Sequence, residues 1–198
     1  REMLCGYAEI LKHAIIYDKK FFFFLKRNTK NILSLNTQVL SKSIKRSCEI
    51  KLRFTERDFT EKGLRMSLNF GHTFAHALEI KNNYSNKLNH GEAVLIGMII
   101  ATRISLFKKL CTKYTYSQIE EIYKKNSLLN NLNKHLRKGE ILNSIKFMKN
   151  DKKKDDEKIS LILLKTIGKT TRPGKYKFDS DQITKIVKNK PTGNTTIN

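Results

Sequence analysis

The run from His90 to Leu110 constrains the fold most, because it combines helical length with apolarity on nearly every side. Its apolar positions include Leu95, Ile96, Met98, Ile99 and Ala101. A helix that is apolar all round has to be covered all round, which places it at the centre of a domain. No uninterrupted apolar run approaches the ~20 residues that cross a bilayer. The sequence therefore predicts a protein built around one buried helix.

Most of the remaining chain also has helical patterning. Apolar residues recur at helical intervals in residues 3–18, 28–40, 41–57, 116–125, 139–150 and 180–188. The FFFF run at residues 21–24 is too short to cross a membrane and predicts core packing. Residues 159–167 are apolar and β-branched enough for a strand, and residues 168–174 can turn it back onto 175–178 as a hairpin. We predict a mainly α fold with one small, late β-hairpin.

The chain is long enough to bury a single core. We predict one helical domain over residues 1–190, with core motifs in 1–107, a tail region in 108–190 and a frayed end at 191–198. Polar stretches at 58–63, 82–89 and 151–158 are expected to be loops. The chain enters a helical pattern at once, without an initiator Met, a signal region or a leading strand. We therefore expect a fragment or a truncated gene product.

The charge of the chain raises nucleic-acid binding as an alternative function, because the formal net charge is +22. The lysines, however, are spread over every segment among many Asn and Ile residues, without finger spacing, an aromatic-basic motif or a basic zipper. A skewed genomic composition explains this pattern better, and we expect neither a nucleic-acid nor a membrane partner. Cys5, Cys48 and Cys111 are odd in number and lack ligand spacing, which predicts free thiols in a reducing, cytoplasmic compartment.

Two histidines four residues apart, His72 and His76, lie in a segment whose apolar spacing suits a helix, so both imidazoles should leave the same face. Two imidazoles and one carboxylate can hold a zinc ion with a position open for water or substrate. His90 opens the next helical run, and Glu9 is a carboxylate among apolar residues, where it is costly unless paired or metal-bound. Thr73 stands where a metalloprotease would need Glu, which disfavours a peptidase.

Four blocks of sequence resemble the C-terminal helical domain of the 3-dehydroquinate synthases, which belong to the sugar phosphate cyclases. In chain order they are GYAEILK (residues 6–12), SCEIK followed by EKGLR (47–65), LNFGHTFAHALE (68–79) and HGEAVLIGM (90–98). A shorter block, MKNDKKK (148–154), extends the resemblance toward the C-terminus. Four blocks in the family's order and at close to its spacing form a specific match.

The resemblance implies a zinc- and NAD-dependent lyase of the shikimate pathway of aromatic amino acid biosynthesis. Such an enzyme converts 3-deoxy-D-arabino-heptulosonate 7-phosphate, a small anionic sugar acid phosphate, to 3-dehydroquinate and phosphate. The family binds NAD through an N-terminal Rossmann-like domain, and no Gly-rich turn after a strand occurs here, so we expect that domain to be missing. The resemblance also implies a homodimer in the full-length form. The isolated chain is expected to fold and bind zinc, or cobalt, without turnover.

The resemblance assigns roles to individual side chains. The implied metal ligands are Glu9, His72 and His90. The implied substrate contacts are Lys12, Lys51, Arg65, Asn69, His76 and Lys152.

Within this second set the charges divide between the two anionic ends of the substrate. Lys51 and Arg65 should engage the carboxylate, where Arg offers a bidentate fork. Asn69, His76 and Lys152 should face the phosphate, with Lys153 as an alternative to Lys152, while Lys12 should contact ring hydroxyls. His76 could instead orient His72. Glu61 either hydrogen-bonds a hydroxyl or orients Lys51.

Other functions stay open on the sequence alone. A sugar phosphate cyclase of the inosose or valiolone type acts on a neutral sugar phosphate, whereas Lys51, Arg65 and Asn69 suit a substrate that carries a carboxylate. A basic nucleic-acid-binding helical module and a degenerate, inactive fragment are the remaining alternatives.

Overall fold

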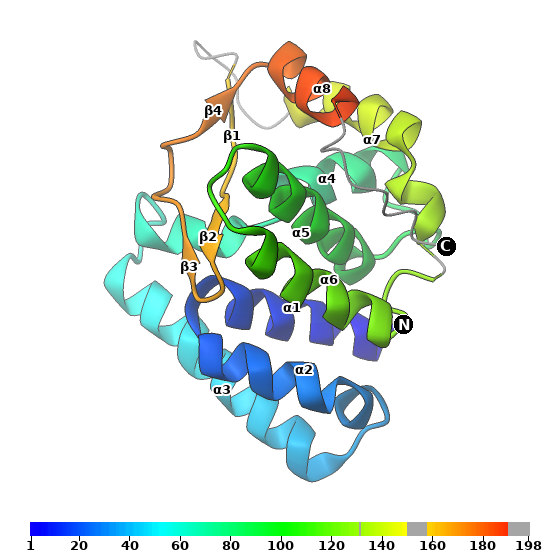
Figure 1. The fold of residues 1–198 in the computed structure, drawn as a ribbon. Helices are drawn as coiled ribbons and strands as arrows, with labels where there is room; N and C mark the ends of the chain where they lie inside the picture. The colour runs from blue at the N-terminus through cyan, green and yellow to red at the C-terminus, as the bar shows by residue number, and fades with distance from the viewer. Residues whose placement is uncertain (131, 150–157, 190–198) are drawn as a thin grey trace.

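The structure is a computed structural model, and it describes residues 1–130, 132–149 and 158–189. The chain is mainly α-helical in these residues (Figure 1). The α-helices are α1 (Glu2–Tyr17), α2 (Lys19–Leu33), α3 (Thr37–Arg57), α4 (His72–Lys81), α5 (His90–Phe107), α6 (Lys113–Lys125), α7 (Lys138–Ile145) and α8 (Ser180–Lys188). Short 3₁₀ helices are η1 (Leu64–Asn69), η2 (Asn133–Leu136) and η3 (Lys146–Lys149). The predicted mainly α fold is confirmed.

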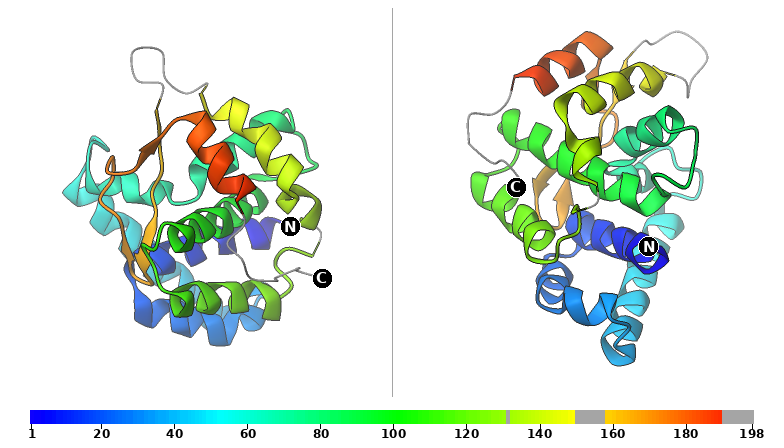
Figure 2. Two further views of the ribbon diagram at one scale, coloured as in Figure 1. Left: turned by 45° about the horizontal axis from the view of Figure 1, so that its top comes forward. Right: turned by 90° about the vertical axis from the view of Figure 1, so that its right-hand side faces the viewer.

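Helix α5 occupies the centre, as its apolar sequence predicts. It packs against α1, α4, α6, α8 and a strand, and every residue from Gly91 to Thr102 is buried. Among the described residues it is the helix whose length and mean hydropathy, 1.4 over 18 residues, would suit a membrane span, but 78% of it is buried inside the protein. Burial of this extent is the pattern of a core helix. Helices α2 and α3 cover α1 on the side away from α5 (Figures 1 and 2).

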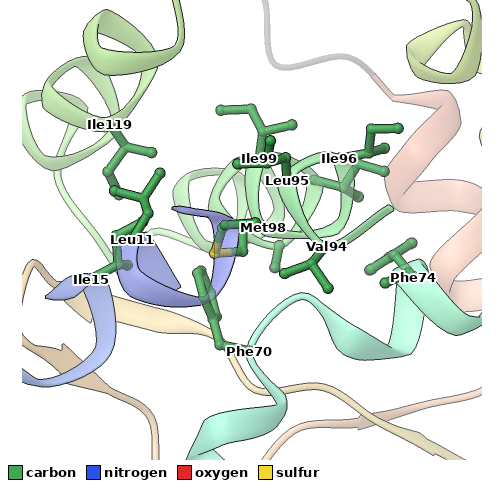
Figure 3. Packing of buried hydrophobic residues seen from close by; sticks show 14 of the residues in the cluster. Leu11, Ile15, Phe70, Phe74, Val94, Leu95, Ile96, Met98, Ile99 and Ile119 are labelled. Carbon is green, nitrogen blue, oxygen red and sulfur yellow. The ribbon is translucent and has the colours of Figure 1, made fainter. Parts of the chain in front are cut away.

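The main core forms where α1, the residues around α4 and α6 meet α5 (Figure 3). The cluster includes Leu11 and Ile15 from α1, Met98 from α5, and Phe70 and Ile119 from two further segments. Each of these five side chains is fully buried. Burying an aliphatic or aromatic side chain contributes about 1.5–3 kcal/mol, so this junction holds α1 firmly against α5.

The joints between the first three helices depend on side-chain caps. Asp18 separates α1 from α2, and its carboxylate accepts hydrogen bonds from the Phe21 N–H and from Arg46 Nε on α3, both at 2.9 Å. The prediction of one helix over residues 28–40 is wrong, because α2 ends at Leu33 and α3 begins at Thr37. Leu35 has a φ of 63°, and the Asn36 side chain caps α3 by accepting from the Val39 N–H. A residue with positive φ followed by an N-cap ends one helix and starts the next.

The helix that carries His72 begins at that residue and does not extend upstream over Leu68 and Phe70. Residues 64–69 form the 3₁₀ helix η1, and Gly71 then takes a φ of 83°, which separates η1 from α4. Glycine adopts this left-handed conformation without the steric cost that a Cβ imposes. The apolar residues upstream of Gly71 therefore pack into the core without belonging to α4.

The predicted hairpin is present in a different form. Strand β1 (Ile159–Ser160) pairs antiparallel with β4 (Lys177–Phe178), as expected, but β2 (Leu164–Thr166) pairs with β3 (Lys169–Thr170) within the predicted turn. The prediction of one continuous strand over 159–167 is thus wrong. Between β1 and β2, two side-chain hydroxyls interrupt the strand pairing. The Leu163 N–H donates to Thr171 Oγ1, and the Leu164 N–H donates to Ser105 Oγ.

The last helical predictions hold with changed limits. The segment predicted as one helix over 139–150 is α7 followed by η3, and α8 matches the predicted closing helix at 180–188. The loops predicted at 58–63 and 82–89 are confirmed. Most of the predicted loop at 151–158 and the predicted frayed end at 191–198 lie outside the described residues. All three cysteines are free, as predicted.

Candidate metal centre

One face of α1 brings a carboxylate and a lysine to the interior. Lys12 is 3% exposed, and its Nζ donates to Glu9 Oε2 at 2.6 Å. Burial lowers the pKa of Lys12, and the neighbouring Glu9 carboxylate opposes that shift. Burial raises the pKa of Glu9, but the charge and hydrogen bond of Lys12 outweigh it and hold the pKa below its usual range. Lys12 therefore favours the ionised form of the Glu9 carboxylate.

Two histidines from different helices approach this carboxylate. Glu9, His72 and His90 each offer one ligand atom, and these atoms lie within 4.8 Å of one another. His72 Nε2 is 3.7 Å from Glu9 Oε1, and the ring centroids of His72 and His90 are 5.4 Å apart. Glu9 Oε1 is buried without a hydrogen-bond partner, although its other oxygen is held by Lys12. A buried carboxylate oxygen aimed at two imidazoles is a set of donors that suits Zn²⁺ or Co²⁺.

Hydrogen bonds donated by the Nδ1 atoms orient the two imidazole rings. His72 Nδ1 lies 3.4 Å from the Phe70 carbonyl oxygen, and His90 Nδ1 lies 3.1 Å from Glu79 Oε1. Both acceptors require Nδ1 to carry the hydrogen, which leaves Nε2 with its lone pair in a neutral ring. Burial and the nearby Lys12 charge lower the pKa of His72 to about 4, whereas the Glu79 hydrogen bond raises that of His90.

His76 follows His72 by one helical turn on α4, and both rings leave the same face, as the spacing predicts. The ring centroid of His76 is 5.5 Å from that of His72 and 6.4 Å from that of His90. The side chain is exposed, unlike the more buried His72. Because the Phe70 carbonyl already orients His72, the exposed ring of His76 is better placed to meet a ligand at the mouth of the cluster.

Helix α3 contributes a further cation beside α1. Lys51 is exposed on α3, and its charge is close enough to lower the pKa of both Lys12 and His13. One turn earlier on α3, Ser47 Oγ is 2.7 Å from Nδ1 of the buried His13. This buried hydrogen bond ties α1 to α3 and so fixes the position of Lys51 relative to Lys12.

Arg65 and Asn69 lie together on η1, which packs against both α1 and α3. Glu61 accepts a hydrogen bond from Asn69 Nδ2 at 2.9 Å and lies 3.6 Å from Arg65 Nε. In the described residues these are the side-chain contacts of Glu61, and contact with Lys51, one of its two expected roles, is not among them. The Asp58 carboxylate accepts hydrogen bonds from the backbone N–H groups of Lys62, Gly63 and Arg65. These bonds hold the loop that precedes η1. The carboxylate of Glu61 thus contacts two of the side chains that are predicted to bind the anionic groups of the substrate.

The predicted phosphate contacts Lys152 and Lys153 lie outside the described residues. The segment that leads to them, η3, packs against α4, the helix of His76.

Three site features were not predicted from the sequence. They are the Glu79 carboxylate, the Phe70 carbonyl and the buried pair of His13 with Ser47. The block LNFGHTFAHALE ends on Glu79, three residues after His76, so its helical position was available as a signal. The partner of Glu79, however, belongs to another helix.

Comparison with known proteins gives the site its family context. The family described as "3-dehydroquinate synthase C-terminal" matches residues 6–154. The chain belongs to the 3-dehydroquinate synthase family. It is 46% identical over 168 residues to a 3-dehydroquinate synthase of Pelagibacter ubique, covering 85% of this chain and 46% of the relative. It is 38% identical over 169 residues to the 3-dehydroquinate synthase of Thermodesulfovibrio yellowstonii, with the same coverage. The chain thus spans about half the length of these 3-dehydroquinate synthases.

Solved structures of sugar phosphate cyclases have the same fold. A 2-deoxy-scyllo-inosose synthase complexed with carbaglucose-6-phosphate, NAD+ and Co2+ superposes with a TM-score of 0.71 at 21% identity, covering 94% of this chain and 51% of that one. A 2-epi-5-epi-valiolone synthase from Streptomyces hygroscopicus, with NAD+ and Zn2+ bound, gives 0.68 at 20% identity, covering 93% and 50%. At this identity the likeness concerns the fold.

Proposed function

We propose that this chain is the metal- and substrate-binding part of a 3-dehydroquinate synthase, acting on 3-deoxy-D-arabino-heptulosonate 7-phosphate in the shikimate pathway. The observation that carries the proposal is the approach of Glu9, His72 and His90, whose ligand atoms lie within 4.8 Å of one another. These residues come from α1, α4 and α5, and nothing in a purely structural helix junction requires two imidazoles to face a carboxylate oxygen without a hydrogen-bond partner.

Glu9, His72 and His90 would hold Zn²⁺, or Co²⁺, which suits the same ligands. Such an ion, when bound, lowers the pKa of a coordinated hydroxyl and polarises a carbonyl. Lys12 keeps the Glu9 carboxylate ionised and turned inward through its 2.6 Å hydrogen bond. The Nδ1 hydrogen bonds of His72 and His90 leave both Nε2 atoms available.

The substrate carries a carboxylate and a phosphate, so its two ends need separate groups of donors. We assign Lys51 and Arg65 to the carboxylate, where binding would displace the Glu61 carboxylate from Arg65. The exposed ring of His76 would meet the phosphate end, together with Asn69. Lys152 remains our candidate for a further phosphate contact, with Lys153 as the alternative.

The proposed reaction would need a nicotinamide cofactor, which would supply reversible hydride transfer. We expect NAD to be bound largely by residues outside this chain, because the chain spans about half the length of its curated relatives. We also propose a homodimer for the full-length enzyme, a cytoplasmic location, and no nucleic-acid or membrane partner.

A second candidate is a cyclase that makes an inosose or a valiolone, since such enzymes share the fold. Dehydroquinate synthase is favoured because identity to curated synthases reaches 46%, against 20% and 21% to the two cyclase structures. The presence of Lys51 near Lys12, and of Arg65 on η1, which packs against α1, agrees with this choice, since the alternative substrates lack a carboxylate.

Metal binding is the first test, and it uses residues 1–198. The wild-type chain should retain one equivalent of Zn²⁺ or Co²⁺ after dialysis, and Glu9→Gln and His72→Ala should lose it. Glu121→Gln is a matched control, because Glu121 also accepts from a lysine at 2.6 Å but lies on the exposed side of α6. A chain that retains no metal, or retains it equally in all variants, would contradict the proposal.

Turnover is the second test, and it uses the full reading frame that contains these residues. Phosphate release from the heptulosonate phosphate should require NAD and should stop after chelation of the metal. Preference for a neutral sugar phosphate instead would favour the second candidate.

A further inference from the structure

Glu79 is a buried carboxylate whose contact is with a candidate metal ligand. It lies near the end of α4, is 9% exposed, and its Oε1 is 3.1 Å from Nδ1 of His90. His90 itself is only half-buried, with 45% of its side chain exposed at the start of α5. An ionised carboxylate is costly to bury unless it is paired, so the location of Glu79 calls for a specific role.

The geometry points to Glu79 as a positioning residue for His90, and we propose that it holds this ring with Nε2 directed toward Glu9 and His72. The inference rests on the proposed metal-binding function. A carboxylate can only accept, so His90 must donate from Nδ1, and its remaining nitrogen is left to bind a cation. Carboxylate–histidine–metal arrangements orient the ring and make the ligand more basic.

The imidazole of His72, at the start of α4, is oriented by a backbone carbonyl instead of a carboxylate. His72 is the first residue of α4, and the Phe70 carbonyl just before the helix accepts from its Nδ1. Glu79 is seven residues further along, two turns toward the end of α4. Helix α4 therefore supplies a ligand and the carboxylate that orients the ligand from α5, and the residues just before it supply the backbone acceptor for His72. A change in the placement of α4 would move both imidazoles together.

An ordinary ion pair between α4 and α5 is the competing explanation, and α4 provides the control for it. Lys81, two residues after Glu79, makes an ion pair with Glu140 on α7 that touches none of the candidate ligands. Glu140→Gln removes a tertiary ion pair of α4 without altering the histidines. Glu79→Ala removes the acceptor for His90, and Glu79→Gln keeps an oxygen that can still accept from Nδ1.

The affinity of residues 1–198 for Co²⁺ is measured by chelator competition, with the visible absorption of the bound ion as a report on its geometry. Glu79→Ala should weaken binding about 10–100-fold and alter the spectrum. Glu79→Gln should restore much of the affinity, and Glu140→Gln should match the wild type in both readouts. If Glu79→Ala binds Co²⁺ as tightly as the wild type with the same spectrum, the positioning role is refuted although metal binding stands. If the wild type binds no Co²⁺, the proposed function fails as well.

A metal-free measurement covers the case in which Glu79→Ala does not fold. Nitrogen-edited NMR of the histidine rings, at a pH where they are neutral, should find His90 in the wild type with its hydrogen on Nδ1. The other tautomer in the wild-type chain would overturn the inference without any variant.

Discussion

Gly97 on α5 lies against the backbone of Gly71, so closely that a Cβ at position 97 would be 2.1 Å from the Gly71 carbonyl oxygen. The contact is reciprocal, because a Cβ at position 71 would be 2.7 Å from the backbone nitrogen of Met98. Two helices can approach this closely only where neither has a side chain at the contact. The spacing between α4 and α5, and hence between His72 and His90, is set by this pair.

Gly97→Ala should therefore destabilise the protein and disturb the metal cluster. Overpacking of a closed contact costs about 1–3 kcal/mol, and here the obstacle is backbone that cannot rotate away. Urea unfolding measures the loss, and Co²⁺ affinity should fall as well. Gly139→Ala on α7 is the matched control, because a Cβ there meets nothing within 4 Å. Equal stability of the two variants would show that the helices can separate without cost.

His13 should make the fold sensitive to acid. Burial and the charge of Lys12 lower the pKa of His13 to about 4, and Glu9 and Lys51 also act on it. An unfolded histidine titrates near 6.5. Between these values the unfolded chain binds more protons, so stability falls as the pH drops from about 6.5 to about 4.

In His13→Gln the free energy of unfolding should fall less steeply over this window, by up to about 1.4 kcal/mol per pH unit. Ser47→Ala is the control, because it removes the buried hydrogen bond but keeps the titrating ring. That variant should be less stable than the wild type while retaining its pH slope. An unchanged slope in His13→Gln would contradict the prediction.

Asp18 should stabilise the joint of α1, α2 and α3 through its charge. Burial raises the pKa of Asp18, but hydrogen bonds from the Phe21 N–H and from Arg46 outweigh it and hold the pKa below its usual range. For a lowered carboxyl pKa, the stabilisation is present above the unfolded value of about 3.9 and is lost as pH falls through the folded one. Asp18→Asn keeps the helix cap and removes the charge, so it should cost about 1–3 kcal/mol at neutral pH.

Denaturant unfolding at several pH values measures this difference, which should vanish in acid, where Asp18 is itself neutral. Asp181→Asn, on an exposed acid in the first turn of α8, should change stability by less than about 0.5 kcal/mol. A difference between Asp18→Asn and wild type that persists in acid would assign the effect to packing instead of charge.

The three thiols should react in the order of their exposure. Cys48 is exposed on α3, Cys5 is partly buried, and burial raises the pKa of the Cys111 thiol to about 11. Because the thiolate is the nucleophile, a chromogenic disulfide at mildly alkaline pH should modify Cys48 first and Cys111 last. Mass spectrometry of the digested chain identifies the site, and in urea the three rates should become similar. Early modification of Cys111 in the folded chain would contradict its burial.

The central helix and the common face of His72 and His76 could be predicted from local sequence, whereas the set of Glu9, His72 and His90 was implied by the family resemblance. The apolarity of α5 allows only a buried position, and the four-residue spacing of His72 and His76 requires one helical face. Glu9 was a candidate because apolar neighbours make an unpaired carboxylate costly. Each of these arguments depends on residues within one element, which is why the structure agrees with them.

The errors arise where distant residues decide the local conformation. The strand predicted over 159–167 is divided because Ser105 and Thr171 accept its backbone N–H groups. Helical periodicity also predicted one helix across Leu35 and Asn36. The chain leaves the helix there, because Leu35 has a positive φ and the Asn36 side chain caps the next helix. The role of Glu79 depends on its contact with His90 of α5, and the spacing of residues along α4 cannot predict a contact with another helix.

Lys12 gives the cluster an internal counter-ion. Its ammonium group is buried beside Glu9 and bonded to the oxygen that does not face the imidazoles. When no cation is bound, the carboxylate is still neutralised from within its own helix. Demetallation should then leave a folded apoprotein that can be reloaded, unlike zinc fingers, which unfold when the ion is withdrawn.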